Sequence, residues 1–212
     1  MTRILPGILA MATIVVASNI LVQFVLLDGL LTWGAFTYPF AFLVTDVVNR
    51  VHGPQTARRV VLAGFAVGVV CSLIGTQITL QGDGYTYPAV PLRVAVASGV
   101  AFLTAQLADI FVFNRVRGGA WWNAPLASSI VGSVIDATLF FTIAFAAFIS
   151  FGAAADSHVS WAWDAAPFLT FGPATPLWVS LAVADWMLKL ALVLIALVPF
   201  RLITKKLTQS LA

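Results

Sequence analysis

Five ionisable side chains lie inside stretches of the sequence that are otherwise apolar: Asp46, Asp109, Asp136, Asp185 and Lys189. A charged residue costs about 3 kcal/mol at the centre of a membrane-spanning helix, so such residues face a bundle interior, pair or line water. Carboxylates accept hydrogen bonds from ring N–H and amine groups. These residues therefore predict a binding site for a small, flat, polar molecule between helices.

The five residues divide by their expected depth. Asp46 and Asp109 fall within about two helical turns of the cytoplasmic edge, whereas Asp136, Asp185 and Lys189 fall near the midplane. Asp185 and Lys189 are four residues apart and can share one helix face. A neutralised structural pair is an equal alternative for these two. Asp136 has no basic neighbour in sequence, which favours a role in binding.

The two acids near the cytoplasmic edge each have an arginine close by in sequence. Asp46 lies four residues before Arg50, and Asp109 lies six residues before Arg115. Each acid could therefore form a clamp with its arginine at the cytoplasmic edge instead of a substrate contact.

Carboxamides and aromatic rings complete the predicted site. A carboxamide such as Gln106 both donates and accepts hydrogen bonds, although Asn19 and Gln106 could also only tie helices together, at about 0.6 kcal/mol per bond. Aromatic faces offer stacking. The predicted substrate-binding residues are Asp136, Asp185, Gln106, Asp46, Lys189, Asp109, Asn19, Tyr38 and Trp186.

Composition indicates a membrane protein. The chain has 212 residues, of which 61% are hydrophobic and 9% charged, against about 25% charged in ordinary soluble domains. Its pI near 9.4 would suggest nucleic acid as a partner of a soluble protein, but here the basic residues lie at helix ends, so we expect none. The single cysteine, Cys71, excludes a disulfide within the chain. No nucleophile–base pair, metal-ligand cluster or phosphate loop is present, so we expect neither an enzyme nor a cofactor.

Hydropathy predicts an all-α integral membrane protein with a single domain over residues 1–212. Six transmembrane helices are expected, the second of them bent at Pro39. A retained first helix is favoured over a cleaved signal peptide because its apolar run continues through Leu27. A short interfacial helix is expected in the loop before the last span. The approximate spans are 4–27, 30–51, 57–80, 92–113, 124–151 and 175–203.

Charge placement predicts that both termini are cytoplasmic. Nine of the 11 basic residues fall on one side of the expected spans, and Arg93 falls on the other with Asp28, Asp83, Asp156 and Asp164. The positive-inside rule places the basic side in the cytoplasm. The nine residues are Arg3, Arg50, Arg58, Arg59, Arg115, Arg117, Arg201, Lys205 and Lys206.

A set of motifs in this order gives the sequence a family resemblance that covers nearly the whole chain. It resembles the queuosine precursor transporters, also grouped as the vitamin uptake transporter family of six-helix bacterial inner-membrane proteins. Family members have a threonine directly after the aspartate that corresponds to Asp136, whereas Ala137 follows Asp136 in this sequence. The residues that carry the resemblance are Thr37-Tyr38-Pro39-Phe40, Phe42-Leu43, Thr45-Asp46, Arg50, Gly53, Ala57-Arg58-Arg59, Gln106, Asp109, Val112-Phe113-Asn114-Arg115, Trp121-Trp122, Ala124-Pro125, Ala127-Ser128, Gly132, Asp136, Phe140-Phe141, Ile143-Ala144-Phe145, Asp185 and Lys189.

The resemblance implies import of 7-deazaguanine precursors (preQ0 and preQ1) that feed modification of a tRNA base. Such a ring offers N–H donors, an amine and a carbonyl, which agrees with the chemistry of the buried acids. A different hypothesis is a substrate-binding subunit of an energy-coupling-factor-type vitamin importer, which needs an ATPase partner. A ridge of small residues, Gly64, Gly68, Ser72 and Gly75, could pack within one bundle or between the protomers of a homodimer.

Overall fold

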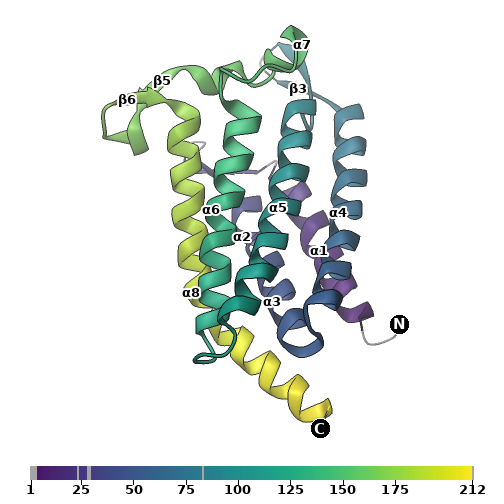
Figure 1. Cartoon of the computed structure of the whole chain (residues 1–212). Helices are drawn as coiled ribbons and strands as arrows, with labels where there is room; N and C mark the ends of the chain where they lie inside the picture. Colours follow the sequence, from purple (N-terminus) through teal and green to yellow (C-terminus); the bar gives the residue numbers. More distant parts are fainter. Residues whose placement is uncertain (1–3, 23, 28–29, 83, 212) are drawn as a thin grey trace.

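The computed structural model describes residues 4–22, 24–27, 30–82 and 84–211. Among these residues, long helices run side by side in one bundle, and short hairpins and turns lie at its ends (Figure 1). Arg3, Asp28 and Asp83, which the charge analysis used, lie outside the described residues. The helices of the bundle are α1 (Leu5–Leu21), α2 (Trp33–Thr37), α3 (Phe40–His52), α4 (Pro54–Gln77), α5 (Leu92–Val116), α6 (Asn123–Phe145) and α8 (Leu177–Leu211).

Three two-stranded antiparallel hairpins connect the helices. They pair β1 (Val25–Leu26) with β2 (Leu31–Thr32), β3 (Thr79–Gly82) with β4 (Tyr85–Pro88), and β5 (Ala165–Pro167) with β6 (Ala174–Pro176). The segment between α6 and α8 also holds α7 (Ala153–Asp156) and two 3-10 turns, η2 (Ser160–Trp163) and η3 (Phe168–Thr170).

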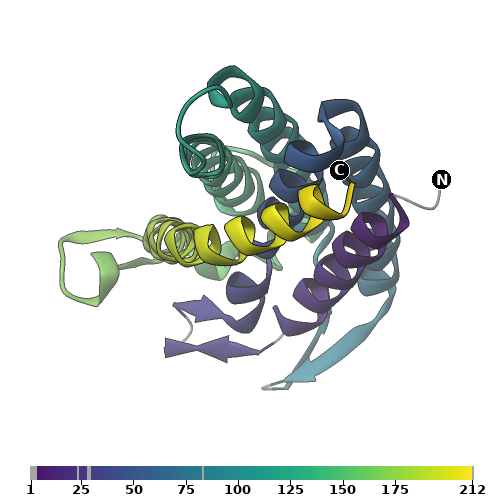
Figure 2. The ribbon, with the colours of Figure 1, turned by 90° about the horizontal axis from the view of Figure 1, so that it is seen from below.

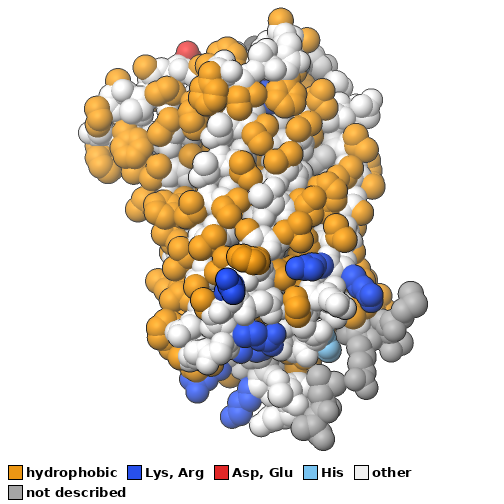
Figure 3. Space-filling model, viewed as in Figure 1, with side chains coloured by type: hydrophobic (Ala, Val, Ile, Leu, Met, Phe, Trp, Pro, Cys, Tyr) orange, Lys and Arg blue, Asp and Glu red, His pale blue; other side chains and the backbone are white. Residues whose placement is uncertain are grey.

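Four of these helices, α4, α5, α6 and α8, are long and apolar enough to cross a membrane. Helix α1 is apolar but has 17 residues. Large apolar side chains on α4 point outward, with Leu62, Leu73 and Ile74 each more than half exposed, as expected of a surface that faces lipid. In Figure 3 hydrophobic side chains cover the upper and middle parts of the visible face, and Lys and Arg gather near the lower end.

The expected first and second spans need correction. Helix α1 ends at Leu21, and the apolar residues after it form part of the β1–β2 hairpin. The expected second helix is not one bent helix, because α2 ends at Thr37 and α3 begins at Phe40. Pro39 lies in this break with a φ of −59°. Proline has no N–H to donate to the preceding turn, which explains why the helix is interrupted here.

The remaining spans differ mainly at their ends. Helix α4 stops at Gln77, because Thr79 begins a strand that pairs back from Pro88. Helix α6 stops at Phe145 and not at residue 151. Helix α8 continues to Leu211 with Pro199 inside it. Its last part departs from the direction of the other helices in Figure 1 and crosses the lower end of the bundle in Figure 2. After α6 the mostly apolar residues 146–151 continue the hydropathy signal beyond the helix end, whereas α8 continues as a helix through polar residues such as Lys205 and Lys206.

Small residues bring the helices close together. A Cβ atom on Gly64 of α4 would lie 2.4 Å from the Met11 side chain of α1, and one on Gly132 of α6 would lie 2.7 Å from the Phe42 ring of α3. Gly64 and Gly68 of the α4 ridge pack against Met11 and Val15 of α1, and Gly75 packs against Val90. The Phe42–Gly132 contact matters further because it lies between two groups of buried polar residues.

Candidate functional site

A cavity of about 410 Å³ lies among α1, α2, α5, α6 and α8, a size typical of small-molecule sites. Its lining also includes Val90 before α5, and His158 and Trp161 beside η2. These connecting segments belong to the end of the bundle away from the two termini (Figure 1). The cavity therefore extends from the middle of the bundle toward that end.

Charged residues from α6 and α8 line the inner part of the cavity. Lys189 Nζ lies 2.6 Å from Asp136 Oδ2 and also forms an ion pair with Asp185. The Tyr38 hydroxyl donates to Asp136 Oδ1 at 3.1 Å, and Lys189 Nζ lies 5.4 Å from the centre of the Tyr38 ring. Two carboxylates and one ammonium give this group, the cavity cluster, a formal charge of −1. It can therefore accept hydrogen bonds from a polar or cationic guest.

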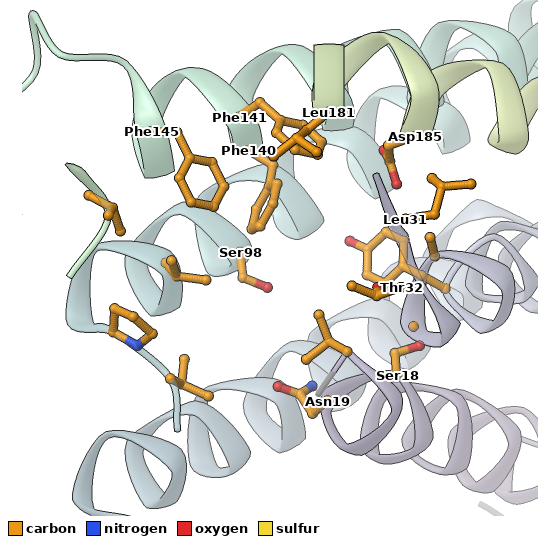
Figure 4. A pocket seen from close by; sticks show the side chains of 18 of the residues that line it. Ser18, Asn19, Leu31, Thr32, Ser98, Phe140, Phe141, Phe145, Leu181 and Asp185 are labelled. Carbon is orange, nitrogen blue, oxygen red and sulfur yellow. The ribbon is translucent and has the colours of Figure 1, made fainter. Parts of the chain in front are cut away.

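The other walls of the cavity are aromatic on one side and neutral polar on the other. Phe140 and Phe141 pack edge to face with ring centroids 5.0 Å apart. Figure 4 shows Phe140, Phe141 and Phe145 across the cavity from Ser18 and Asn19. A planar molecule placed between them would meet ring faces on one side and hydrogen-bonding groups on the other.

A second group of polar residues, the inner cluster, lies outside the cavity lining. Ser128 and Ser129 of α6 donate to the two carboxylate oxygens of Asp46, at 3.1 and 3.2 Å. Asp109 of α5 lies beside Asp46. Thr45 donates to Gln106 Oε1 at 2.6 Å. All six residues of the inner cluster are buried: Thr45, Asp46, Gln106, Asp109, Ser128 and Ser129.

Aromatic side chains separate the two clusters. On α6, Gly132 lies four residues after Ser128 and four before Asp136, and the Phe42 ring packs against it. Phe42 is 2% exposed. The Tyr38 ring contacts both Phe42 and Phe102 edge to face. These contacts close the bundle between the cavity and the inner cluster.

The predicted site residues therefore fall into three places. Five of them line the cavity: Asn19, Tyr38, Asp136, Asp185 and Lys189. Three others, Asp46, Gln106 and Asp109, belong to the inner cluster. Trp186 does not line the cavity, and its buried indole N–H finds no hydrogen-bond partner among the described residues.

The expected arginine clamps do not form. Arg50 donates instead to the backbone carbonyls of Arg117 and Trp121, at 3.5 and 3.3 Å. Arg115 is exposed and makes no ion pair with Asp109. Asp136, which has no basic neighbour in sequence, gains Lys189 from another helix. Sequence spacing cannot reveal a pair between two helices.

Sequence reasoning missed several residues of the cavity wall. Ser98 and His158 were not predicted, because neither lies beside an intramembrane acid in sequence. Phe140 could have been found, because it follows Asp136 by four residues and so lies on the same face of α6. Among the described residues no group of three or more His, Cys, Asp or Glu side chains could hold a metal ion.

One more ion pair lies beyond the cavity wall. Arg93 of α5 is fully buried, donates to the carbonyl of Ile143 at 2.8 Å, and pairs with Asp156 of α7 at 3.0 Å. Hydrogen bonds from the Ser150 hydroxyl and the Phe151 N–H, with a smaller contribution from Arg93, hold the pKa of the Asp156 carboxyl below its ordinary value. This pair ties the segment after α6 to α5.

Comparison with known proteins decides the family. Residues 32–204 match the family described as a putative vitamin uptake transporter. They include every cavity residue except Ser18, Asn19, Val22, Leu30 and Leu31. The chain belongs to this family. The family predicted from the motifs is thus confirmed, and the apolar helices are those of a multi-pass membrane protein.

Curated relatives of the chain carry a more specific name. The queuosine precursor transporter of Escherichia coli is 37% identical over 141 residues, which cover 62% of this chain and 64% of that protein. A probable queuosine precursor transporter of Haemophilus influenzae is 38% identical over 121 residues, 54% of this chain and 52% of that protein. One from Bacillus subtilis is 28% identical over 134 residues. The matches thus span between about half and two thirds of these relatives. No solved structure matches the chain significantly.

Proposed function

We propose that this chain imports queuosine precursors, the 7-deazaguanines preQ0 and preQ1 or a closely related purine-like heterocycle, across the bacterial inner membrane. The observation that carries the proposal is the cavity cluster, in which Asp136 and Asp185 share one cation at the inner end of the cavity. The names of the relatives from Escherichia coli and Haemophilus influenzae support the substrate class.

The chemistry of the cavity suits such a ring. Asp136 keeps acceptor capacity beyond its bonds from Tyr38 and Lys189, so it can accept from a ring N–H or an amine. Asn19 and Ser98 offer groups for a ring carbonyl. Phe140 and Phe141 offer stacking faces. Stacking on an aromatic side chain is typically worth about 1–3 kcal/mol per base.

We further propose that the polypeptide crosses the membrane six times with both termini in the cytoplasm. The crossings would be α1, the interrupted pair α2 and α3, then α4, α5, α6 and α8. Both termini lie at the lower end in Figure 1, and Figure 3 has Lys and Arg side chains near that end, as the positive-inside rule requires. The cavity would then be accessible from the outer side, with the inner cluster on the cytoplasmic side.

The test is uptake of radiolabelled preQ0 and preQ1 into proteoliposomes that contain this chain and no ATPase. We expect saturable uptake by the wild type, loss of uptake in Asp136→Asn, and unchanged uptake in the matched control Asp164→Asn, whose carboxylate is exposed in a loop. Uptake only after addition of an ATPase complex would replace the proposal with the importer-subunit hypothesis. Normal uptake by a well-folded Asp136→Asn variant would remove Asp136 from the site.

A further inference from the structure

The inner cluster holds two acidic side chains in contact and fully inside the protein. Asp109 is 0% exposed and Asp46 is 2% exposed. Asp46 accepts from both Ser128 and Ser129. Asp109 lies against Asp46 and Ser128, and neither of its carboxylate oxygens accepts a hydrogen bond of ordinary geometry from the described residues. The two neighbouring acids thus differ in the hydrogen bonds that they accept from the described residues.

Arg50 of α3 lies close enough to Asp46 for an electrostatic interaction, but no cation of the described residues is paired with either acid. On α3, the guanidinium of Arg50 is held by two carbonyls outside the cluster, and His52 lies near the helix end. On α6 and α8, Asp136, Asp185 and Lys189 are paired with one another. The other cations of the helices around it are exposed: Arg58, Arg59, Arg115, Arg117 and Arg201.

Two carboxamides at the inner cluster also lack partners for their N–H groups. Gln106 Nε2 and Asn49 Nδ2 are buried and form no hydrogen bond with described residues. Gln106 precedes Asp109 by one helical turn, and Asn49 follows Asp46 by the same interval. A buried donor without an acceptor is costly. Each of these donors lies one helical turn from an acid of the inner cluster, so the inner cluster holds more hydrogen-bonding groups than the described residues satisfy.

Two ionised carboxylates in contact repel strongly in a buried site, so such a pair retains one proton between its members. The two serine hydroxyls stabilise Asp46 as the ionised member, because an ionised carboxylate is the stronger acceptor. Asp109 then carries the proton as a carboxylic acid. Release converts the Asp109 acid into a carboxylate and one free proton.

We infer that Asp109 and Asp46 form a proton-binding site on the cytoplasmic side of the Phe42–Gly132 contact. This proton is the coupling ion of the import proposed above, a role that rests on that function. The cavity cluster binds the substrate, and the inner cluster binds the ion. A single proton suffices for this pair, because one proton held between the two acids removes the repulsion of two ionised carboxylates.

Infrared difference spectroscopy tests the proton site without any substrate. Purified protein is titrated from neutral to alkaline pH, and the carbonyl band of protonated carboxylic acid is followed. We expect the wild type to lose a band that is missing from Asp109→Asn and unchanged in Asp164→Asn. The same band in Asp109→Asn would overturn the proposal. A second outcome would also overturn the proposal: a wild type that shows no such band and that sodium, but not potassium, stabilises against heat.

A second variant keeps the test decisive if Asn at position 109 prevents folding. The double variant Ser128→Ala with Ser129→Ala removes both donors to Asp46 and retains both acids. We expect it to hold the proton to a more alkaline pH than the wild type, by about one pH unit for a change of 1.4 kcal/mol. An unchanged titration would contradict the assignment of Asp46 as the ionised member.

Transport measurements test the coupling. With an inward proton gradient, the wild type should accumulate labelled preQ1 above its external concentration, whereas Asp109→Asn should equilibrate it without accumulation. Accumulation by Asp109→Asn equal to the wild type would overturn the coupling. If the wild type takes up no deazaguanine at all, the proposed function fails, and the infrared titration still decides whether the proton site exists.

Discussion

The cavity cluster and the inner cluster each contain a pair of aspartates, but only the cavity cluster also contains a cation. Asp136 and Asp185 share Lys189 and line a cavity. Asp46 accepts from two serine hydroxyls, Asp109 accepts no hydrogen bond from the described residues, and both acids lie outside that cavity. A cation keeps carboxylates ionised and ready to accept hydrogen bonds from a guest. Without a cation, the second pair is suited to hold a proton.

The position of the two clusters teaches a second point. Both lie along α6, with Ser128 in one, Asp136 in the other, and Gly132 between them. Because Phe42 packs on Gly132, its ring lies between the cavity cluster and the inner cluster in this conformation. A transporter with alternating access requires such a closed layer on one side of its site.

The largest expected effect follows from removing the cation of the cavity cluster. Lys189→Met leaves two buried carboxylates without a cation, and breaking a buried ion pair in this way costs about 3–5 kcal/mol. We expect loss of thermal stability together with complete loss of uptake, measured by a melting scan and a proteoliposome assay. The control is Lys205→Met, since Lys205 is exposed near the C-terminus. A stable Lys189→Met protein with normal uptake would contradict the different roles assigned to the two clusters.

A smaller effect is expected at the layer between the clusters. Gly132→Ala places a Cβ atom 2.7 Å from the Phe42 ring, so the ring must shift. Overpacking of this kind costs typically about 1–3 kcal/mol. We expect slower uptake with little change in substrate affinity. Gly118→Ala is the control, because nothing lies within 4 Å of a Cβ atom built there. Equal rates in the two variants would show that the Phe42–Gly132 layer need not open.

The smallest effect concerns Asp156, which lies outside both clusters. Its pKa is lowered, chiefly by the Ser150 hydroxyl and the Phe151 N–H. An acid with a lowered pKa in the folded state contributes stability above its unfolded pKa of about 3.9, and that contribution is lost as pH falls through the folded value. Asp156→Asn should therefore lower the melting temperature slightly at neutral pH and flatten its dependence on acid pH. If the melting temperature of Asp156→Asn falls with acid pH as that of the wild type does, this contribution of Asp156 is contradicted.

Several parts of this account could be predicted from sequence alone. The sequence predicted the intramembrane acids, the i, i+4 pair of Asp185 with Lys189, and the family. The free-energy cost of a charge in lipid and the spacing of residues along a helix are local properties, so the sequence carries them directly. The pairing of Asp136 with Lys189 was not predicted, because it joins two helices. Nor was the split of Asp46 and Asp109 from the cavity, which depends on where Phe42 packs. Helix ends were missed where apolar strands such as Val25–Leu26 continue the hydropathy signal.

Equilibrium binding tests the central claim most directly. Purified wild type, Asp136→Asn and Asp109→Asn would be titrated with preQ1 and preQ0 by calorimetry at neutral pH. Loss of a hydrogen bond to a charged group costs about 1.5–3 kcal/mol, so we predict binding about 10- to 150-fold weaker in Asp136→Asn. Asp109→Asn should bind as the wild type does. Equal affinity in Asp136→Asn, with weakened binding in Asp109→Asn, would place the substrate in the inner cluster and contradict the account.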